Sequence, residues 1–179
     1  MELIVGVVHA EEFVEAVDGA LKERYPSGIE SLMLEIPSNW RQFRHTFEPN
    51  DKFFLELAKI YSSRGTRIIY GDSPINQSIP FTWVDLLVDR FFTHNRDKSM
   101  LKIIEKRNPQ VVLVGNGHAN YIKRRNPAVP YLTFRANPLS KADAIIEYLL
   151  GNSSYANQII RLNYAHPREY YLRKHRIIS

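Results

Sequence analysis

The sequence predicts an α/β domain: an open, mostly parallel sheet of about five strands with helices on both faces. Short apolar, β-branched runs such as Leu3–Val8 and Gln110–Val114 are typical of strands that are buried on both faces. Between these runs, apolar residues recur at helical spacing. Because strand and helix signals alternate along the chain, a parallel sheet with right-handed crossovers is expected.

The individual elements follow from the same pattern. Strands are expected at Leu3–Val8, Ser31–Ile36, Arg67–Tyr70, Gln110–Val114 and Tyr131–Phe134. Helices are expected over 11–24, from the cap Asn50 to the stop Gly65, over 80–107, and from the cap Ser140 to Leu150. The stretch 80–107 should break near Thr93-His94-Asn95, and Gly115-Asn116-Gly117 should open a further helix.

The chain has 179 residues, which suits one domain with a substantial core. Residues 1–150 are expected to form the α/β core that carries the candidate site. Residues 151–179 are expected to form a basic, Tyr- and Arg-rich C-terminal extension that packs on the core or on a partner. A second copy of the chain is one such partner, which would make the protein a homodimer.

The composition excludes several classes of protein. The chain has no cysteine, which rules out disulfides, iron–sulfur clusters and a cysteine nucleophile. No apolar run reaches the roughly 18 residues that span a bilayer. The N-terminus lacks the basic segment of a secretory signal, so a cytoplasmic protein is expected. The basic, aromatic tail could bind single-stranded nucleic acid, but without a recognised motif this interpretation is the less favoured one.

Polar side chains fall at the carboxyl ends of four predicted strands. His9 ends the first strand, Glu35 lies at the end of the second, Asp72 follows the third, and His118 follows the fourth. In open α/β sheets, ligands bind outside these strand ends. We therefore expect the four side chains to converge; the alternative is that each is an isolated polar group.

The residue types suggest two kinds of chemistry. Two imidazoles and a carboxylate, here His9, His118 and Glu35, are a frequent ligand set for Zn, Fe, Mn or Co. A bound metal could generate hydroxide near neutral pH. Without a metal, one histidine could act as a general base oriented by Glu35. Asn116, between two glycines after the fourth strand, is a candidate for binding a substrate anion, although a plain tight turn is the alternative.

The spacing Gly-x-x-His occurs twice, as Gly6-Val7-Val8-His9 and Gly115-Asn116-Gly117-His118. Glu35, Asp72 with Pro74-Ile75, and Arg96-Asp97 with Met100 lie between the two copies. This ordered set resembles the TraB, pheromone-shutdown and Tiki family, which is related more distantly to erythromycin esterase and a haem-binding lipoprotein group. The resemblance covers about two thirds of the chain, and it departs from the family pattern at Val7, Ser73 and Asn95.

The resemblance implies a parallel α/β core and, as in Tiki-like members, a protease that depends on a divalent metal. It implies that His9, Glu35 and His118 are metal ligands or catalytic groups, that Asp72 supports them, and that Arg96 binds a substrate carboxylate or an oxyanion. We therefore expect a TraB-like peptidase or amidase that acts on a peptide or a small molecule. The alternative is a non-catalytic protein that sequesters a small anionic ligand or peptide.

The simpler interpretations of two nearby groups are also open. Arg96 and Asp97 are adjacent on a predicted helix and could be a solvated pair. His94 is expected at the surface.

Overall fold

The computed structural model describes residues 1–7, 13–42, 49–72, 94–137 and 156–163. Its strands are β1 (Leu3–Val7), β2 (Ser31–Pro37), β3 (Arg67–Asp72), β4 (Val111–Gly115), β5 (Tyr131–Asn137) and β6 (Gln158–Asn163). Its helices are α1 (Val14–Arg24), α2 (Pro49–Ser63), α4 (Asn95–Arg107) and α5 (Asn116–Arg125), with a short 3₁₀ helix at Trp40–Gln42. None of these described helices is long and apolar enough to cross a membrane.

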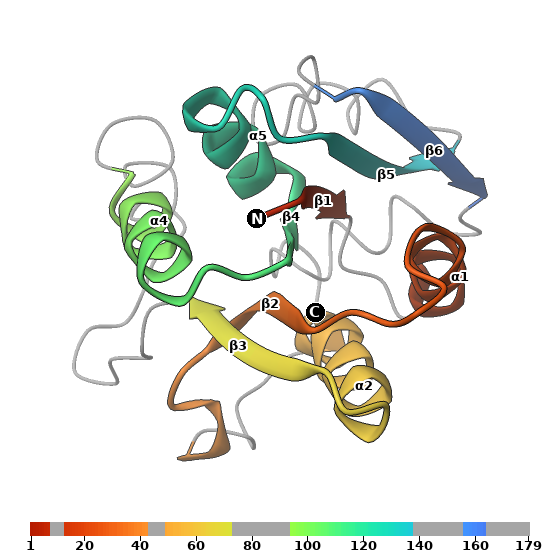
Figure 1. Ribbon diagram of the computed structural model, residues 1–179, viewed down its shortest axis with the longest axis horizontal. Coiled ribbons are helices and arrows are strands. Elements are labelled where there is room, and N and C mark those ends of the chain that lie inside the picture. Colours follow the sequence, from red (N-terminus) through yellow and green to blue (C-terminus); the bar gives the residue numbers. More distant parts are fainter. Residues whose placement is uncertain (8–12, 43–48, 73–93, 138–155, 164–179) are drawn as a thin grey trace, which may run out of the picture.

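The six strands form one open sheet in the order β3-β2-β4-β1-β5-β6, and every neighbouring pair is parallel. Helices α1 and α2 cover one face, and α4 and α5 cover the other (Figure 1). The α/β fold with an open parallel sheet is therefore confirmed, with six strands instead of about five.

Alternation along the strands divides the core into two layers. Leu3, Val5 and Val7 of β1 pack on the α1 and α2 side, whereas Ile4 packs on the α4 and α5 side. All four side chains are at most 2% exposed. Successive residues of a strand point to opposite faces, so a strand buried on both faces must be apolar at every position. This is why the short apolar runs mark the central strands.

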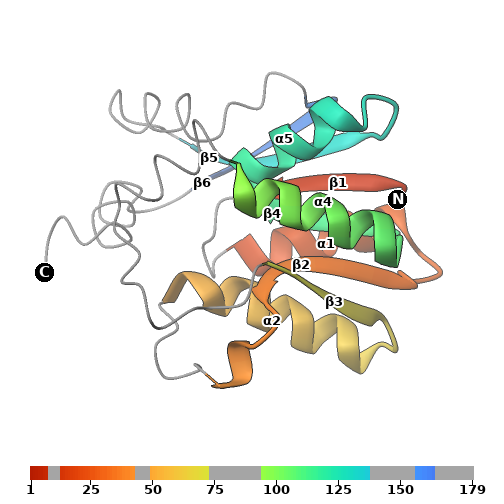
Figure 2. The same cartoon turned by 90° about the vertical axis from the view of Figure 1, so that its left-hand side faces the viewer.

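The connections after β2 and β4 define where a ligand would bind. The two strands are neighbours in the sheet, but α2 follows β2 on one face and α5 follows β4 on the other. Where adjacent strands send their chains to opposite faces, a crevice opens at their carboxyl ends. Figure 2 shows this edge of the sheet on the left and the N-terminus at the opposite edge.

One expected helix boundary is present, two expected helical segments lie outside the described residues, and one strand was missed. Helix α4 begins at Asn95, at the position of the expected break, because His94 has a left-handed backbone with φ of 50°. Residues 80–93 and the helix expected from Ser140 to Leu150 lie outside the described residues. Strand β6 was not predicted; it lies within the expected C-terminal extension and pairs with β5 at the edge of the sheet.

Candidate functional site

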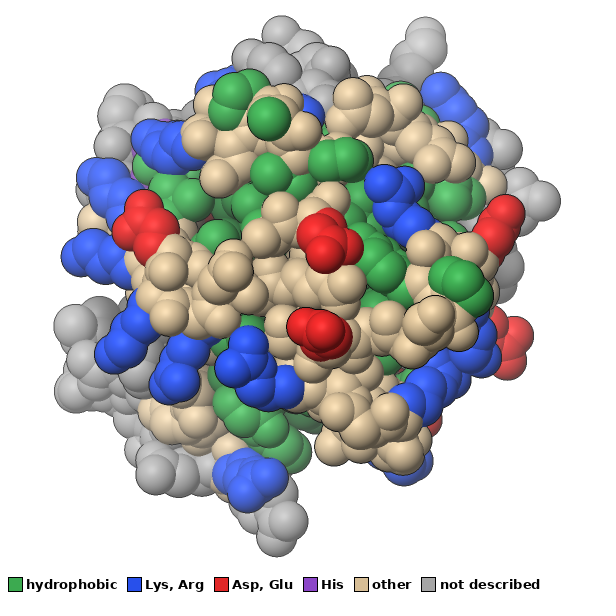
Figure 3. All heavy atoms as spheres, in the orientation of Figure 1, with side chains coloured by type: hydrophobic (Ala, Val, Ile, Leu, Met, Phe, Trp, Pro, Cys, Tyr) green, Lys and Arg blue, Asp and Glu red, His purple; other side chains and the backbone are tan. Residues whose placement is uncertain are grey.

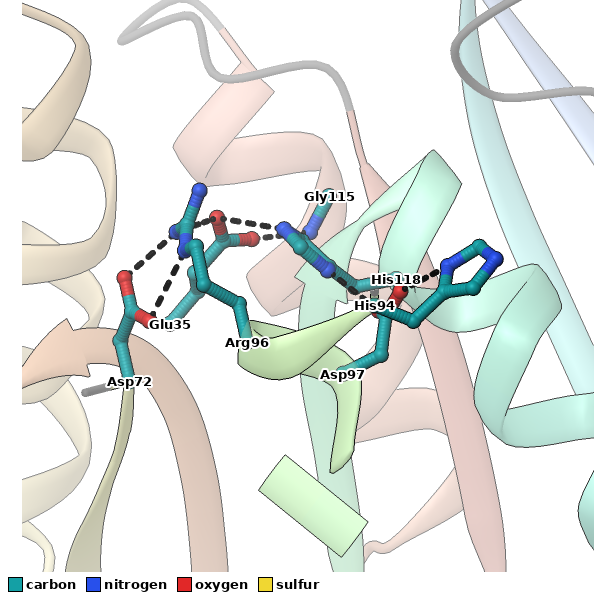
Figure 4. Close-up of polar contacts among 7 residues, drawn as sticks. All are labelled: Glu35, Asp72, His94, Arg96, Asp97, Gly115 and His118. Atoms are coloured by element: carbon teal, nitrogen blue, oxygen red, sulfur yellow. Dashed lines mark hydrogen bonds and ion pairs between the residues drawn. The ribbon is translucent and has the colours of Figure 1, made fainter. Parts of the chain in front are cut away.

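Two of the predicted site residues are carboxylates at the ends of neighbouring strands. Glu35 lies near the end of β2, and Asp72 is the last residue of β3. Both residues are 8% exposed. Removing a carboxylate from water is costly unless it is paired, so both side chains need partners. Arg96, in the first turn of α4, provides one for each (Figure 4).

Arg96 spans the two carboxylates. Its Nε donates to Asp72 Oδ1 at 3.1 Å, and its Nη2 donates to Asp72 Oδ2 at 2.5 Å and to Glu35 Oε1 at 3.0 Å. The fork on Asp72 is the bidentate geometry that favours arginine over lysine. Glu35 and Asp72, two of the four strand-end side chains expected to converge, thus meet through Arg96 in the structure.

The second oxygen of Glu35 connects two strands. Glu35 Oε2 accepts the backbone N–H of Gly115, the last residue of β4, at 2.7 Å. Glu35 thus links the carboxyl ends of the neighbouring strands β2 and β4. The side chain of Glu35 is therefore fixed by an arginine on one side and by a backbone amide on the other.

His118 lies in the first turn of α5, between two carboxylates. Its Nδ1 is 2.6 Å from Asp97 Oδ1, and its Nε2 is 3.4 Å from Glu35 Oε1. Burial lowers the pKa of His118, but the negative charge of Glu35 and the hydrogen bond to Asp97 outweigh burial and raise the pKa to about 9. The imidazole is therefore protonated at neutral pH and can donate from both nitrogens.

Asp97 is the site residue that the sequence analysis missed. Its side chain is 2% exposed, so Arg96-Asp97 is not a solvated helix pair. One oxygen of Asp97 faces His118, and the other faces His94 Nδ1 at 3.1 Å. His94 is partly exposed, but its ring belongs to the same network and packs 4.7 Å from the ring of Tyr121. The spacing of three between His94 and Asp97, on one side of a helical turn, is the sequence signal that could have found it.

Asn116 does not join this network. Its side-chain amide donates to the Phe134 carbonyl at 3.2 Å and accepts from the Thr133 hydroxyl at 2.5 Å. It is 7% exposed and ties α5 to β5. Its hydrogen bonds are made within the protein, so nothing in its surroundings supports the predicted role in substrate binding.

Gly6, the first glycine of the repeated motif, is explained by the same contact. A Cβ on Gly6 would meet the Asn116 amide and would lie 2.6 Å from the Tyr131 hydroxyl. The glycine is thus required for close packing beside β1. His9, three residues later, lies outside the described residues, so its predicted place in the site is untested.

The described residues alone do not form the expected divalent-metal site, and His9, one of its three expected ligands, lies outside them. Among the residues that the structure describes, no three His, Asp or Glu side chains are grouped so that they could hold a metal ion. Both oxygens of Glu35 already accept hydrogen bonds, one from Arg96 and one from the Gly115 amide. A centre holding Mn, Co, Zn or Fe through His9, Glu35 and His118 stays a prediction from the sequence alone.

The charges of the site also bear on the alternative, anionic ligand. Among the described residues, the carboxylates of Glu35, Asp72 and Asp97 face Arg96 and the protonated His118. The guanidinium of Arg96 is therefore already matched by protein carboxylates. This arrangement gives an arriving anion less attraction than a surplus of positive charge would, and binding of an anion by Arg96 stays a prediction.

Comparison with known proteins adds no family assignment. No protein-family model matches the chain, and no curated protein matches it at a significant level. What this site does has to be inferred from its own geometry.

Proposed function

We propose that the chain is a hydrolase of amide or peptide bonds, in which His118 and Glu35 transfer protons at the carboxyl edge of the sheet. The observation that carries the proposal is the row Asp97, His118, Glu35, with both nitrogens of one imidazole facing carboxylates. An imidazole oriented by a buried carboxylate recurs in general acid–base catalysis. The position of the row, where β2 and β4 separate, is where α/β proteins bind ligands.

The two groups would divide the work. The ionised Glu35 accepts a proton from the attacking water, and the cationic His118 donates its Nε2 proton to the leaving nitrogen. Cleavage of the C–N bond then yields a carboxylic acid and an amine. Because Glu35 Oε1 and His118 Nε2 are 3.4 Å apart, the proton on Glu35 can return to His118 and restore both groups. Over the complete cycle the only protons added to the products are those of the water molecule, and Glu35 and His118 return to their starting protonation states.

Asp97 and Arg96 would support these steps in different ways. Asp97 accepts the Nδ1–H of His118, which holds Nε2 toward Glu35 and stabilises the cation. Arg96 donates to Glu35 and keeps this carboxylate ionised. The resemblance to the TraB and Tiki family supports a hydrolase in general. The charge pairing of the described residues favours a mechanism in which these side chains move the protons themselves.

The test is a comparison of two histidine variants. Purified protein is first assayed on a panel of peptides, amides and esters, and the best substrate is then used for His118→Gln and His94→Asn. Both imidazoles contact Asp97 through Nδ1, but only His118 faces Glu35. Asparagine tolerates the left-handed backbone of residue 94. We expect kcat/KM to fall by about 100-fold or more in His118→Gln and by only a few-fold in His94→Asn.

Either of two results would refute the proposal. One is the absence of hydrolysis across the whole panel, and the other is an equal loss in both variants. A chelator arm separates the mechanism from the metal-dependent one: activity should survive exhaustive chelation, and loss of activity with recovery on adding a divalent metal would favour the metal centre instead.

A further inference from the structure

A cleft lies at the amino ends of strands β2 and β3, opposite the carboxyl ends that carry the candidate site. Its volume is about 520 Å³, and it is lined by residues 21–22, 25–30, 61 and 64–66. These segments are the C-terminal ends of α1 and α2 and the turns that lead into β2 and β3. Figure 3 views the molecule from this side and shows Lys and Arg side chains spread over it, with Asp and Glu side chains among them. Pockets of this size accommodate small organic ligands.

Two cations on the cleft share one buried carboxylate. Asp18 of α1 is 8% exposed. Its Oδ1 accepts a hydrogen bond from Arg64 Nη1 at 2.5 Å, and its Oδ2 accepts one from Arg64 Nη2 at 3.0 Å and lies 2.9 Å from Lys22 Nζ. The hydrogen bond to Arg64 lowers the pKa of Asp18 to about 2, so this carboxylate is ionised at neutral pH. Where Lys22 and Arg64 border the cleft, two cations therefore share one carboxylate.

Aromatic rings and aliphatic side chains surround these two cations. The ring of Tyr61 is buried, and the guanidinium carbon of Arg64 lies 5.1 Å from its centre. Stacking on Tyr61 and the fork on Asp18 together fix the plane of the Arg64 guanidinium. Leu21 and Ile29 add buried apolar surface, and the partly buried Tyr25 adds an aromatic ring. A ligand here would meet a rigid cationic group beside rings and aliphatic side chains.

We propose that this cleft binds a small anion carried on an aromatic ring, that is, an aryl carboxylate or an aryl phosphate. The anionic head would pair with Lys22 and Arg64, and the ring would pack against Tyr25 and Ile29. Arginine held in a fixed plane suits the flat oxygens of carboxylate and phosphate. Glu30 also lines the cleft and is exposed, so a preference for cationic ligands is the result that the test must be able to detect.

The experiment titrates the full chain with probes that separate charge from shape. Benzoate and benzamidine have nearly the same shape and opposite charge, phenyl phosphate carries a different anionic head, and acetate lacks the ring. Binding is followed in ¹H–¹⁵N spectra. We expect saturable binding of benzoate and phenyl phosphate, at least tenfold tighter than binding of benzamidine or acetate, with shifted amides in residues 21–30 and 61–66.

Variants then place the site. Lys22→Gln removes one cation and leaves the Arg64–Asp18 pair intact, and we expect it to weaken benzoate binding roughly fivefold. Lys59→Gln is the matched control, because Lys59 is also an exposed lysine in an ion pair within a helix but does not line the cleft. Arg64→Lys keeps the charge, loses the fork, and should also weaken binding. The proposal is overturned if benzamidine binds as tightly as benzoate, if neither anion saturates, or if both lysine variants behave alike.

Discussion

At the scale of single residues, the candidate site depends on the protonation of His118. Glu35 and Asp97 hold the imidazole as a cation, so the groups proposed to exchange a proton with substrate begin in the right states: an acid at His118 and a base at Glu35. The basic limb of activity should therefore follow the pKa of His118, which is about 9.

Replacing Asp97 by Asn should shift that limb. The variant keeps a side chain of similar size but removes the negative charge that stabilises the His118 cation, so the pKa of His118 should fall by at least about one unit. Activity should then decline at a lower pH than in the wild type. The pH profile of kcat/KM and the titration of the His118 ring signals check this together. An unchanged pKa of the His118 ring would show that Asp97 does not stabilise the protonated imidazole.

A second residue-scale prediction concerns Gly6, where space is the limiting factor. Gly6→Ala places a methyl group against Asn116 and the Tyr131 hydroxyl, and overpacking of this kind costs about 1–3 kcal/mol of the free energy of unfolding. Gly19→Ala is the control: Gly19 lies in α1 with nothing within 4 Å of a new Cβ, so alanine should stabilise the helix by about 0.5–1 kcal/mol. Urea denaturation measures both, and a Gly6→Ala variant as stable as the wild type would contradict the close packing.

At the scale of elements, the sequence revealed those whose burial forces a simple pattern. Strands β1, β2 and β4 lie inside the sheet and are apolar at most positions, so their positions along the chain follow from the runs of apolar residues alone. Strand β6 is an edge strand with Ile159 exposed and Arg161 in its middle. A half-exposed strand need not be apolar throughout, and its pattern resembles that of the surrounding polar tail.

The site follows the same division. Glu35 and Asp72 could be located because strand ends are fixed by the pattern of the strands. Asp97 lies on a helix, and its burial depends on how α4 packs against α5, so its spacing from His94 indicates a local pair but does not reveal that Asp97 is buried against His118.

Lys123 of α5 supports an element-scale prediction. This buried lysine donates to the carbonyls of Pro127 and Val129 at 2.8 and 2.7 Å, and it reaches Asn157, just before β6, at 3.5 Å. Lys123→Met should cost about 2–3 kcal/mol of the free energy of unfolding, because two carbonyls lose a charged donor. Lys102→Met, at an exposed position of α4, should change stability by less than about 0.5 kcal/mol. If chemical denaturation gave equal changes in stability for the two variants, the hydrogen bonds of Lys123 would not stabilise the turn at Pro127 and Val129.

At the scale of the whole molecule, the protonation of His118 couples stability to pH. Its pKa is raised from 6.5 to about 9 in the folded state, so its contribution is fully present below pH 6.5 and is lost as the pH rises through 9. The loss amounts to about 3 kcal/mol at most. The free energy of unfolding, measured between pH 6 and pH 9.5, should fall more in the wild type than in His118→Gln. Parallel curves for the two proteins would contradict this coupling.

The strand order has a consequence for how the chain is made. Strand β4 lies between β2 and β1, although more than seventy residues separate it from β2 in the sequence. A nascent chain that has emerged only as far as β3 has a vacant slot in the middle of its sheet, with apolar strand faces and unpaired backbone groups on both sides. During synthesis, β1, β2 and β3 therefore cannot complete their sheet before residues 111–115 leave the ribosome, and their exposed apolar faces can aggregate until then. The insertion that completes the sheet also delivers the Gly115 amide to Glu35, so the candidate site is assembled in the same step that ends this vulnerable interval.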